Sequence, residues 1–238
     1  MNSKRISLKV SDAPDMGAYV SIPEGKGPFP AVLVFQEAFG VNGHIRNVTD
    51  RIAKENNYVA IAPELFHRTA TAGFECGYTD FEVVKPHFAG ISPEGLTADI
   101  KATYDWLLQQ PEVVKDKIGT IGFCLGGRVS FLANMVIPVS AAISYYGGGI
   151  PPLLGKVNDV HAPHLFFWGG LDKHIPAEQI TQVTDAMTKA GKPFINTVIS
   201  YADHGFNCDE KPVYNPQAAG EAWSMAMTFL KNKFGSSN

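Results

Sequence analysis

The sequence is poor in cysteine, with three in 238 residues: Cys76, Cys124 and Cys208. An odd number of widely spaced cysteines does not indicate the disulfide framework of a small secreted domain. We therefore expect a reducing, cytoplasmic location, in which a thiol with a chemical role stays free.

Long apolar runs and blocks of basic residues are also missing. No apolar segment reaches the length of a transmembrane helix, and no apolar run follows the basic pair Lys4 and Arg5, as a signal peptide would require. The net charge is −3, from 20 basic and 23 acidic side chains, which argues against nonspecific nucleic-acid binding. We therefore expect neither a membrane nor a nucleic acid as a partner.

Strand-like and helix-like segments alternate along the chain, and 45% of its residues are hydrophobic, enough for a large core. This alternation predicts an α/β fold, with a mostly parallel sheet, helices on both faces and a single domain over residues 1–238. The irregular segment 64–93 is expected to be a functional cap or loop. Strands are predicted at 6–10, 18–22, 30–35, 58–62, 118–123, 139–145, 164–168 and 193–200, and helices at 44–56, 93–110, 128–136, 177–190 and 216–234.

The most informative motif is Gly-Phe-Cys-Leu-Gly-Gly at 122–127, between an apolar strand and a helical pattern. It has the layout of a nucleophile elbow, G-x-S-x-G, with Cys124 in place of the serine. The flanking residues must be small because the turn holds its central residue in a strained conformation. Cys124 is therefore the candidate nucleophile, and the N–H of Leu125 is a candidate oxyanion donor. A cysteine that only packs as a small hydrophobe is the alternative.

A cysteine nucleophile needs a base, and the base needs a carboxylate to orient it. Asp172 and His204 each follow the end of a later apolar run, where ligands bind in open α/β sheets. The chain order nucleophile, acid, histidine is that of an α/β-hydrolase. We therefore predict a triad of Cys124, His204 and Asp172. The alternatives are Asp172 as a turn residue, Asp203 as the acid and His204 as a structural histidine.

Two further patterns carry less information. His161 and His164 have the H-x-x-H spacing of metal ligands, but Pro163 forbids a helix there and no third ligand stands out. We therefore expect no metal, and no other cofactor. The segment Tyr145-Tyr146-Gly147-Gly148-Gly149 follows a predicted strand, so it is expected either to border the substrate pocket or to form a plain turn.

Four motifs together resemble the dienelactone hydrolase family of α/β-hydrolases over nearly the whole chain. They are Gln-Glu-Ala-Phe-Gly at 36–40, the elbow at 122–127, Gly-Gly-Leu-Asp at 169–172 and Asp-His-Gly-Phe at 203–206. The resemblance implies hydrolysis of a small ester or lactone through an acyl-thioester on Cys124. It also implies that Glu37 can take the thiol proton. The backbone N–H of Ala38 is the candidate second oxyanion donor.

The chain departs from the family at the cations that hold an anionic substrate. No arginine follows His204, so Arg68 is the candidate cation and Arg128 is assigned a structural role. Tyr145 and Phe206 are the other predicted substrate-binding residues. The alternative functions are a thioesterase or peptidase on the same scaffold, or a redox-sensing or ligand-binding module without activity. We expect a small-molecule substrate and a monomer or homodimer.

Overall fold

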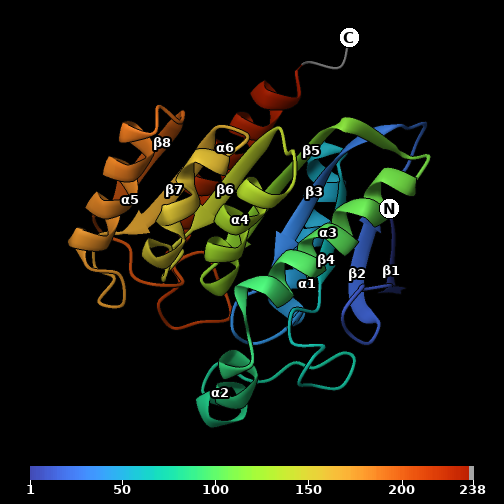
Figure 1. Cartoon of the computed structure of the whole chain (residues 1–238), viewed down its shortest axis with the longest axis horizontal. Coiled ribbons are helices and arrows are strands. Elements are labelled where there is room, and N and C mark those ends of the chain that lie inside the picture. The colour runs from blue at the N-terminus through green and yellow to red at the C-terminus, as the bar shows by residue number, and fades with distance from the viewer. Residues whose placement is uncertain (236–238) are drawn as a thin grey trace. The chain divides into compact units, whose positions relative to one another are not determined.

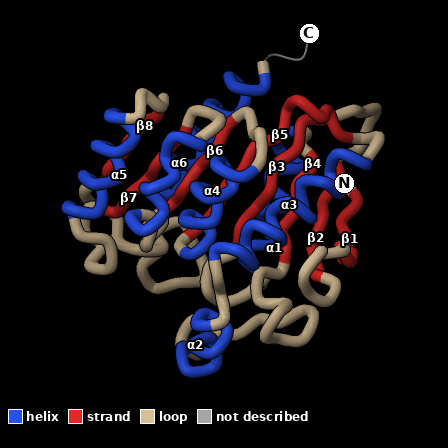
Figure 2. The backbone as a smooth tube through the Cα atoms, in the orientation of Figure 1, coloured by secondary structure: helices blue, strands red, loops and turns tan. Residues whose placement is uncertain are grey.

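The structure is a computed structural model that describes residues 1–235. Two compact units make up the chain, Met1–Ile118 and Gly119–Asn238, and strands alternate with helices in both (Figure 1, Figure 2). The prediction of one domain over the whole chain stays a prediction. No helix within residues 1–235 is long and apolar enough to cross a membrane.

The first unit contains a mixed sheet. The strands β1 and β2 pair antiparallel with Ile6 opposite Ala18, and β2 pairs antiparallel with β4. The strand β3 pairs parallel with β4, with Val32 opposite Ala60. Six of the seven residues of β3 are buried, as an unbroken apolar run requires. The strands are β1 (Asn2–Leu8), β2 (Met16–Ile22), β3 (Phe29–Phe35) and β4 (Val59–Pro63).

The helices of the first unit begin at residues whose side chains satisfy free backbone N–H groups. Asn42 caps α1 (Gly43–Asn56) by accepting from the N–H of Ile45 at 3.2 Å. Ser92 caps α3 (Pro93–Gln109) by accepting from the N–H of Gly95 at 3.0 Å, as the sequence predicts. A third helix, α2 (Phe81–Ala89), lies between β4 and α3.

The second unit contains a parallel sheet. Its strands are β5 (Val113–Phe123, which begins in the first unit), β6 (Ala141–Tyr145), β7 (His164–Gly169) and β8 (Phe194–Ile199). Every residue of β6 and β7 is buried. The helices are α4 (Leu125–Val136), the 3₁₀ segment η1 (Pro151–Asp159), α5 (Ala177–Lys189) and α6 (Pro216–Phe234). In Figure 1, α4 and α5 lie in front of these strands and α6 lies behind them.

The predicted elements are present, with ends shifted by a few residues, but 64–93 is not wholly irregular. The sequence analysis did not predict the helix α2, because its pattern of residues resembles that of a loop. Pro86 lies inside it, and Val84 is its one buried residue, while Phe81 and Val83 are 62% and 50% exposed. A helix that buries so little has no apolar stripe that a sequence pattern can reveal.

Candidate active site

The turn at Cys124 has the strained geometry that the motif predicts. Cys124 has φ 54° and ψ −113°, a conformation rarely adopted by residues other than glycine. A Cβ on Gly122 would lie 1.8 Å from the carbonyl oxygen of Gly126, and one on Gly127 would lie 2.8 Å from that of Tyr145. Glycine is therefore required at both positions for β5 to turn into α4 at this angle.

The structure brings Cys124, His204 and Asp172 together from three loops of the second unit. His204 Nε2 lies 3.0 Å from Cys124 Sγ, and His204 Nδ1 lies 2.7 Å from Asp172 Oδ2. The Asp172 side chain is only 1% exposed, whereas that of His204 is 17% exposed. The imidazole therefore links a partly accessible thiol to a buried carboxylate, which is the geometry of an activated nucleophile.

Asp172 makes the contacts of both roles that the sequence left open, the turn residue and the partner of His204. Its Oδ1 accepts from the backbone N–H groups of His174 and Ile175, at 2.8 and 3.3 Å, and so builds the turn after β7. Its Oδ2 is thereby aimed at His204. Asp203, the rival acid, turns its Oδ1 back to the N–H of His204 at 2.7 Å. This bond is made to the backbone of His204 and not to its imidazole, so it orients the loop.

The surroundings of His204 favour its charged form. Burial lowers the pKa of the imidazole, but the hydrogen bonds to Asp172 and Cys124, and the charges of these groups, outweigh burial and raise the pKa to about 10. At neutral pH the imidazole therefore carries a proton beside the thiol sulfur.

An aromatic cluster lies beside the imidazole. Tyr145 and Phe206 are both fully buried, with ring centroids 6.1 Å apart. Their burial favours a packing role, and their predicted contact with substrate stays a prediction. Tyr146, which belongs to the segment 145–149, lies against the His204 ring with centroids 5.2 Å apart. His174, which the sequence analysis did not single out, lies against the same ring with centroids 5.3 Å apart. His174 is exposed and so lies at the rim of the site.

The second histidine of the H-x-x-H pair, His164, has a structural role. His164 is buried, and burial lowers its pKa to about 3, so it is neutral. The Ser144 hydroxyl donates to the Gly127 carbonyl at 2.6 Å and lies 2.8 Å from His164 Nε2, which can donate to it. Asn134 Nδ2 lies 3.3 Å from His164 Nδ1. This network holds the first turn of α4, directly after Cys124.

Glu37 and Ala38 belong to the first unit and directly follow β3. Glu37 is buried, with 1% exposure. Its carbonyl accepts from Gln36 Nε2 at 3.1 Å, and Gln36 Oε1 accepts from the N–H of Leu65 at 3.1 Å. The loop is therefore held in a defined conformation. The predicted roles of Glu37 as a proton acceptor and of Ala38 as an oxyanion donor stay predictions.

Arg68 is engaged by protein groups. Its Nη2 donates to Asp12 at 2.9 Å, to Asp99 at 2.8 Å and to the carbonyl of Gly95 at 3.2 Å. A guanidinium shared between two carboxylates would have to exchange them for a substrate anion. These contacts therefore argue against the predicted substrate-binding role, which no observation tests directly. Lys85, the other cation of this segment, is exposed on α2.

Arg128 lies on the first turn of α4, four residues after Cys124. It is partly buried, and a Cβ built on Gly149 would lie 3.2 Å from its Nη1. Burial lowers the pKa of Arg128, and the charge of Cys124 opposes this shift. The thiol is therefore within electrostatic reach of this guanidinium.

Residues 16–234 match the model of the dienelactone hydrolase family. The chain belongs to this family. A candidate carboxymethylenebutenolidase from Synechocystis sp. is 37% identical over 220 residues, which cover 87% of this chain and 88% of that protein. A carboxymethylenebutenolidase from Pseudomonas putida is 30% identical over 233 residues, or 97% of each chain.

The crystal structure of a candidate dienelactone hydrolase from Klebsiella pneumoniae superposes with a TM-score of 0.85. It is 28% identical and covers 97% of this chain and 99% of its own. The predicted α/β-hydrolase fold with a mostly parallel sheet is therefore confirmed, as is the family. The chain is a hydrolase of the dienelactone hydrolase type, which acts on an ester or lactone bond.

Proposed function

We propose that this dienelactone hydrolase family member cleaves a small ester or lactone with Cys124 as nucleophile, His204 as acid and base and Asp172 as the orienting carboxylate. The observation that carries the proposal is the continuous contact from the thiol through the imidazole to a buried carboxylate, at 3.0 and 2.7 Å. A thiol that only senses oxidation requires neither partner, so this contact favours catalysis over a sensor.

The proposed reaction has two steps. The Cys124 thiolate attacks the carbonyl carbon, and the oxyanion accepts from the N–H of Leu125, which lacks an acceptor within α4 as a first-turn N–H. The imidazolium of His204 then protonates the leaving alcohol oxygen as the carbon–oxygen bond breaks. In the second step His204 takes a proton from water, the hydroxide displaces sulfur, and the acid is released. The role of the Ala38 N–H as a second oxyanion donor stays a prediction from the sequence.

Trapping the acyl-enzyme tests this proposal. When the protein is mixed with an aryl acetate and quenched with acid within milliseconds, the peptide that contains Cys124 should gain the mass of one acetyl group. The Cys76→Ala variant should give the same adduct, because Cys76 lies outside the contact chain. Steady turnover with no adduct on Cys124, or with an adduct elsewhere, would contradict the proposed nucleophile.

The second expected result concerns the charge of the substrate. We expect a neutral ester or lactone to be hydrolysed at least as efficiently as its analogue with a free carboxylate, because Arg68 is held by Asp12 and Asp99 and no arginine follows His204. An anion buried without a paired cation costs several kcal/mol. The measurement is kcat/KM for a matched pair, a carboxylate and its methyl ester.

A preference for the anion of more than about a hundredfold, roughly 2.7 kcal/mol, would contradict this expectation. Arg128 would then be the cation to test first, because it lies one helical turn from Cys124. In that case Arg128→Met should remove the preference and leave hydrolysis of the methyl ester in place. Arg68→Met serves as the matched control.

A further inference from the structure

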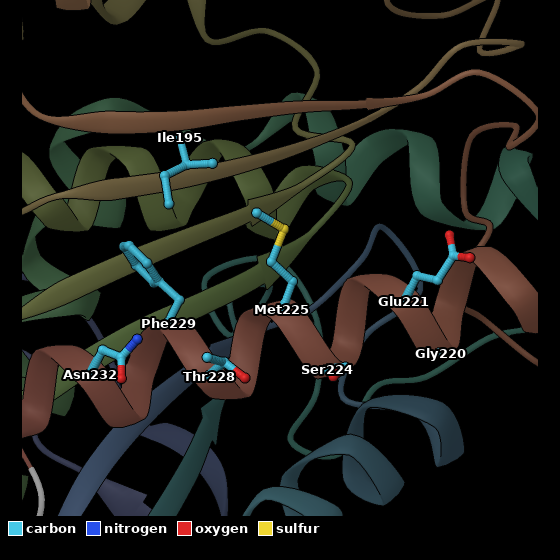
Figure 3. A pocket seen from close by; sticks show the side chains of 8 residues that line it. All are labelled: Ile195, Gly220, Glu221, Ser224, Met225, Thr228, Phe229 and Asn232. Carbon is cyan, nitrogen blue, oxygen red and sulfur yellow. The ribbon is translucent and has the colours of Figure 1, made fainter.

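The second unit carries an apolar groove of about 650 Å³ between α6 and β8, away from the triad residues. Figure 3 shows Ile195 of β8 above the end of α6 that carries Phe229, with Met225 near the middle. Glu221 lies at the other end of the groove. We call this surface, lined mainly by Ile195, Glu221, Met225, Thr228 and Phe229, the α6/β8 groove.

The strand beside the groove is an unprotected edge. β8 pairs with β7 along one side, and no other strand among the described residues pairs with it. Its sequence, Phe-Ile-Asn-Thr-Val-Ile, contains no charge and no proline, the usual protections against edge-to-edge pairing. Ile195 and Val198, on opposite faces of the strand, are 40% and 50% exposed. Apolar side chains are thus exposed on both faces of an open edge.

An acidic residue, Glu221, lines one end of the groove, and a basic residue, Lys233, lies beside Phe229, which lines the other end. Glu221 accepts from the Tyr201 hydroxyl and from Gln217 Nε2, and these bonds hold the pKa of its carboxyl below the ordinary value. Lys233 Nζ lies 5.6 Å from the centroid of the Phe229 ring, at the other end. Glu221 and Lys233 are twelve residue positions apart, a distance of about 18 Å along α6.

The centre of the groove lies near the middle of both β8 and α6. Thr197, in the middle of β8, contacts Met225 Sδ at 3.8 Å, and Met225 lies between Glu221 and Lys233 on α6. Tyr201, just after β8, contacts Glu221, so β8 and α6 run in opposite directions. A two-fold axis through this centre therefore reverses the strand and exchanges the two charged ends together.

We propose that the α6/β8 groove is the contact surface of a symmetric homodimer. The two β8 strands pair antiparallel at their open edges, and the two α6 helices lie side by side in opposite directions. Glu221 of each copy then faces Lys233 of the other, and Met225 and Ile195 fill the grooves. A second copy is the occupant that fits because a surface with an acidic end, an apolar centre and a basic end is complementary to itself after a two-fold rotation.

Charge reversal tests this arrangement directly. Sedimentation equilibrium should show a dimer for the natural chain. Glu221→Lys alone, and Lys233→Glu alone, should each weaken the dimer at least about tenfold, because symmetry places each like-charge pair twice in the interface. An equimolar mixture of the two variants should recover the dimer as a heterodimer, since both contacts again join opposite charges. Recovery of the dimer in the mixture would show that both variants are folded and that each loses the dimer through this contact.

An edge variant tests the strand pairing. Val198→Lys should give a monomer that keeps its ester hydrolysis, since the triad lies within one copy. Val83→Lys is the matched control, because Val83 has the same 50% exposure but lies on α2 of the first unit. A natural chain that stays monomeric at 100 micromolar would overturn the proposal. So would a dimer that survives both Val198→Lys and the single charge reversals, because the copies would then meet elsewhere.

Discussion

The Cys124→Ala variant is expected to lose ester hydrolysis, with a fall in kcat on the order of a millionfold, as in other hydrolase triads that lose the nucleophile. Alanine removes the sulfur and keeps the Cβ, so the strained turn and the packing of Gly122 and Gly127 are preserved. The measurements are steady-state turnover of an aryl ester and labelling by substoichiometric iodoacetamide, both of which should disappear while the circular dichroism spectrum is unchanged.

The two other cysteines provide matched controls. Burial, with a smaller effect of the Asp80 charge, raises the pKa of the Cys76 thiol, which disfavours its reactive form. Cys208 is fully buried. Cys76→Ala and Cys208→Ala should therefore keep turnover and labelling within a few-fold. Full turnover in Cys124→Ala would show a different nucleophile, and Cys208 would be tested first because it lies four residues after His204.

The Asp172→Asn variant is expected to lower kcat by about a hundredfold or more, with a smaller effect on KM. Asparagine can still accept from the N–H groups of His174 and Ile175, so the turn after β7 is kept. It removes the charge that faces His204 Nδ1. The pKa of the imidazole should therefore fall from about 10, because burial, which lowers it, is no longer outweighed to the same extent.

Two measurements separate the charge of Asp172 from a structural role. An NMR titration of the His204 ring proton reports the pKa directly, and it should move to lower pH in Asp172→Asn. Asp203→Asn is the matched control, because Asp203 contacts the backbone N–H of His204, and its kcat should change less than tenfold. Large damage from Asp203→Asn with none from Asp172→Asn would mean that the acid has been misassigned.

Pattern-based prediction succeeded where the relevant interactions are local. The Ser92 cap of α3 depends on a side chain three residues from its partner, and the strained turn at Cys124 depends on glycines two residues before and three residues after it. The buried strands β3, β6 and β7 are recognisable because each is a continuous apolar run. The helix α2 was missed because its own residues, with Pro86 inside and apolar side chains exposed, do not carry a helical stripe.

The side-chain environment of the predicted site residues could not be obtained in this way. Arg68 was selected as a cation in a variable segment, but its two carboxylate partners come from positions 31 and 56 residues away. Tyr145 was selected at the end of an apolar run and Phe206 at the end of the motif at 203–206, and only packing shows that they are fully buried. A sequence shows which residues are charged or aromatic, but it does not show which partners their side chains contact.

The sequence by itself determined the family, the mostly parallel α/β fold and the cysteine at the elbow, because each is encoded by short motifs or by periodic apolar segments. The tertiary structure alone decided which carboxylate faces His204, since Asp172 and Cys124 reach it across 32 and 80 residues of chain. It also decided that β8 is an open edge beside an apolar groove with opposite charges at its ends. The physical reason is that hydrogen bonding, burial and electrostatic neighbours are set by distances in space, which folding establishes between residues far apart in the chain.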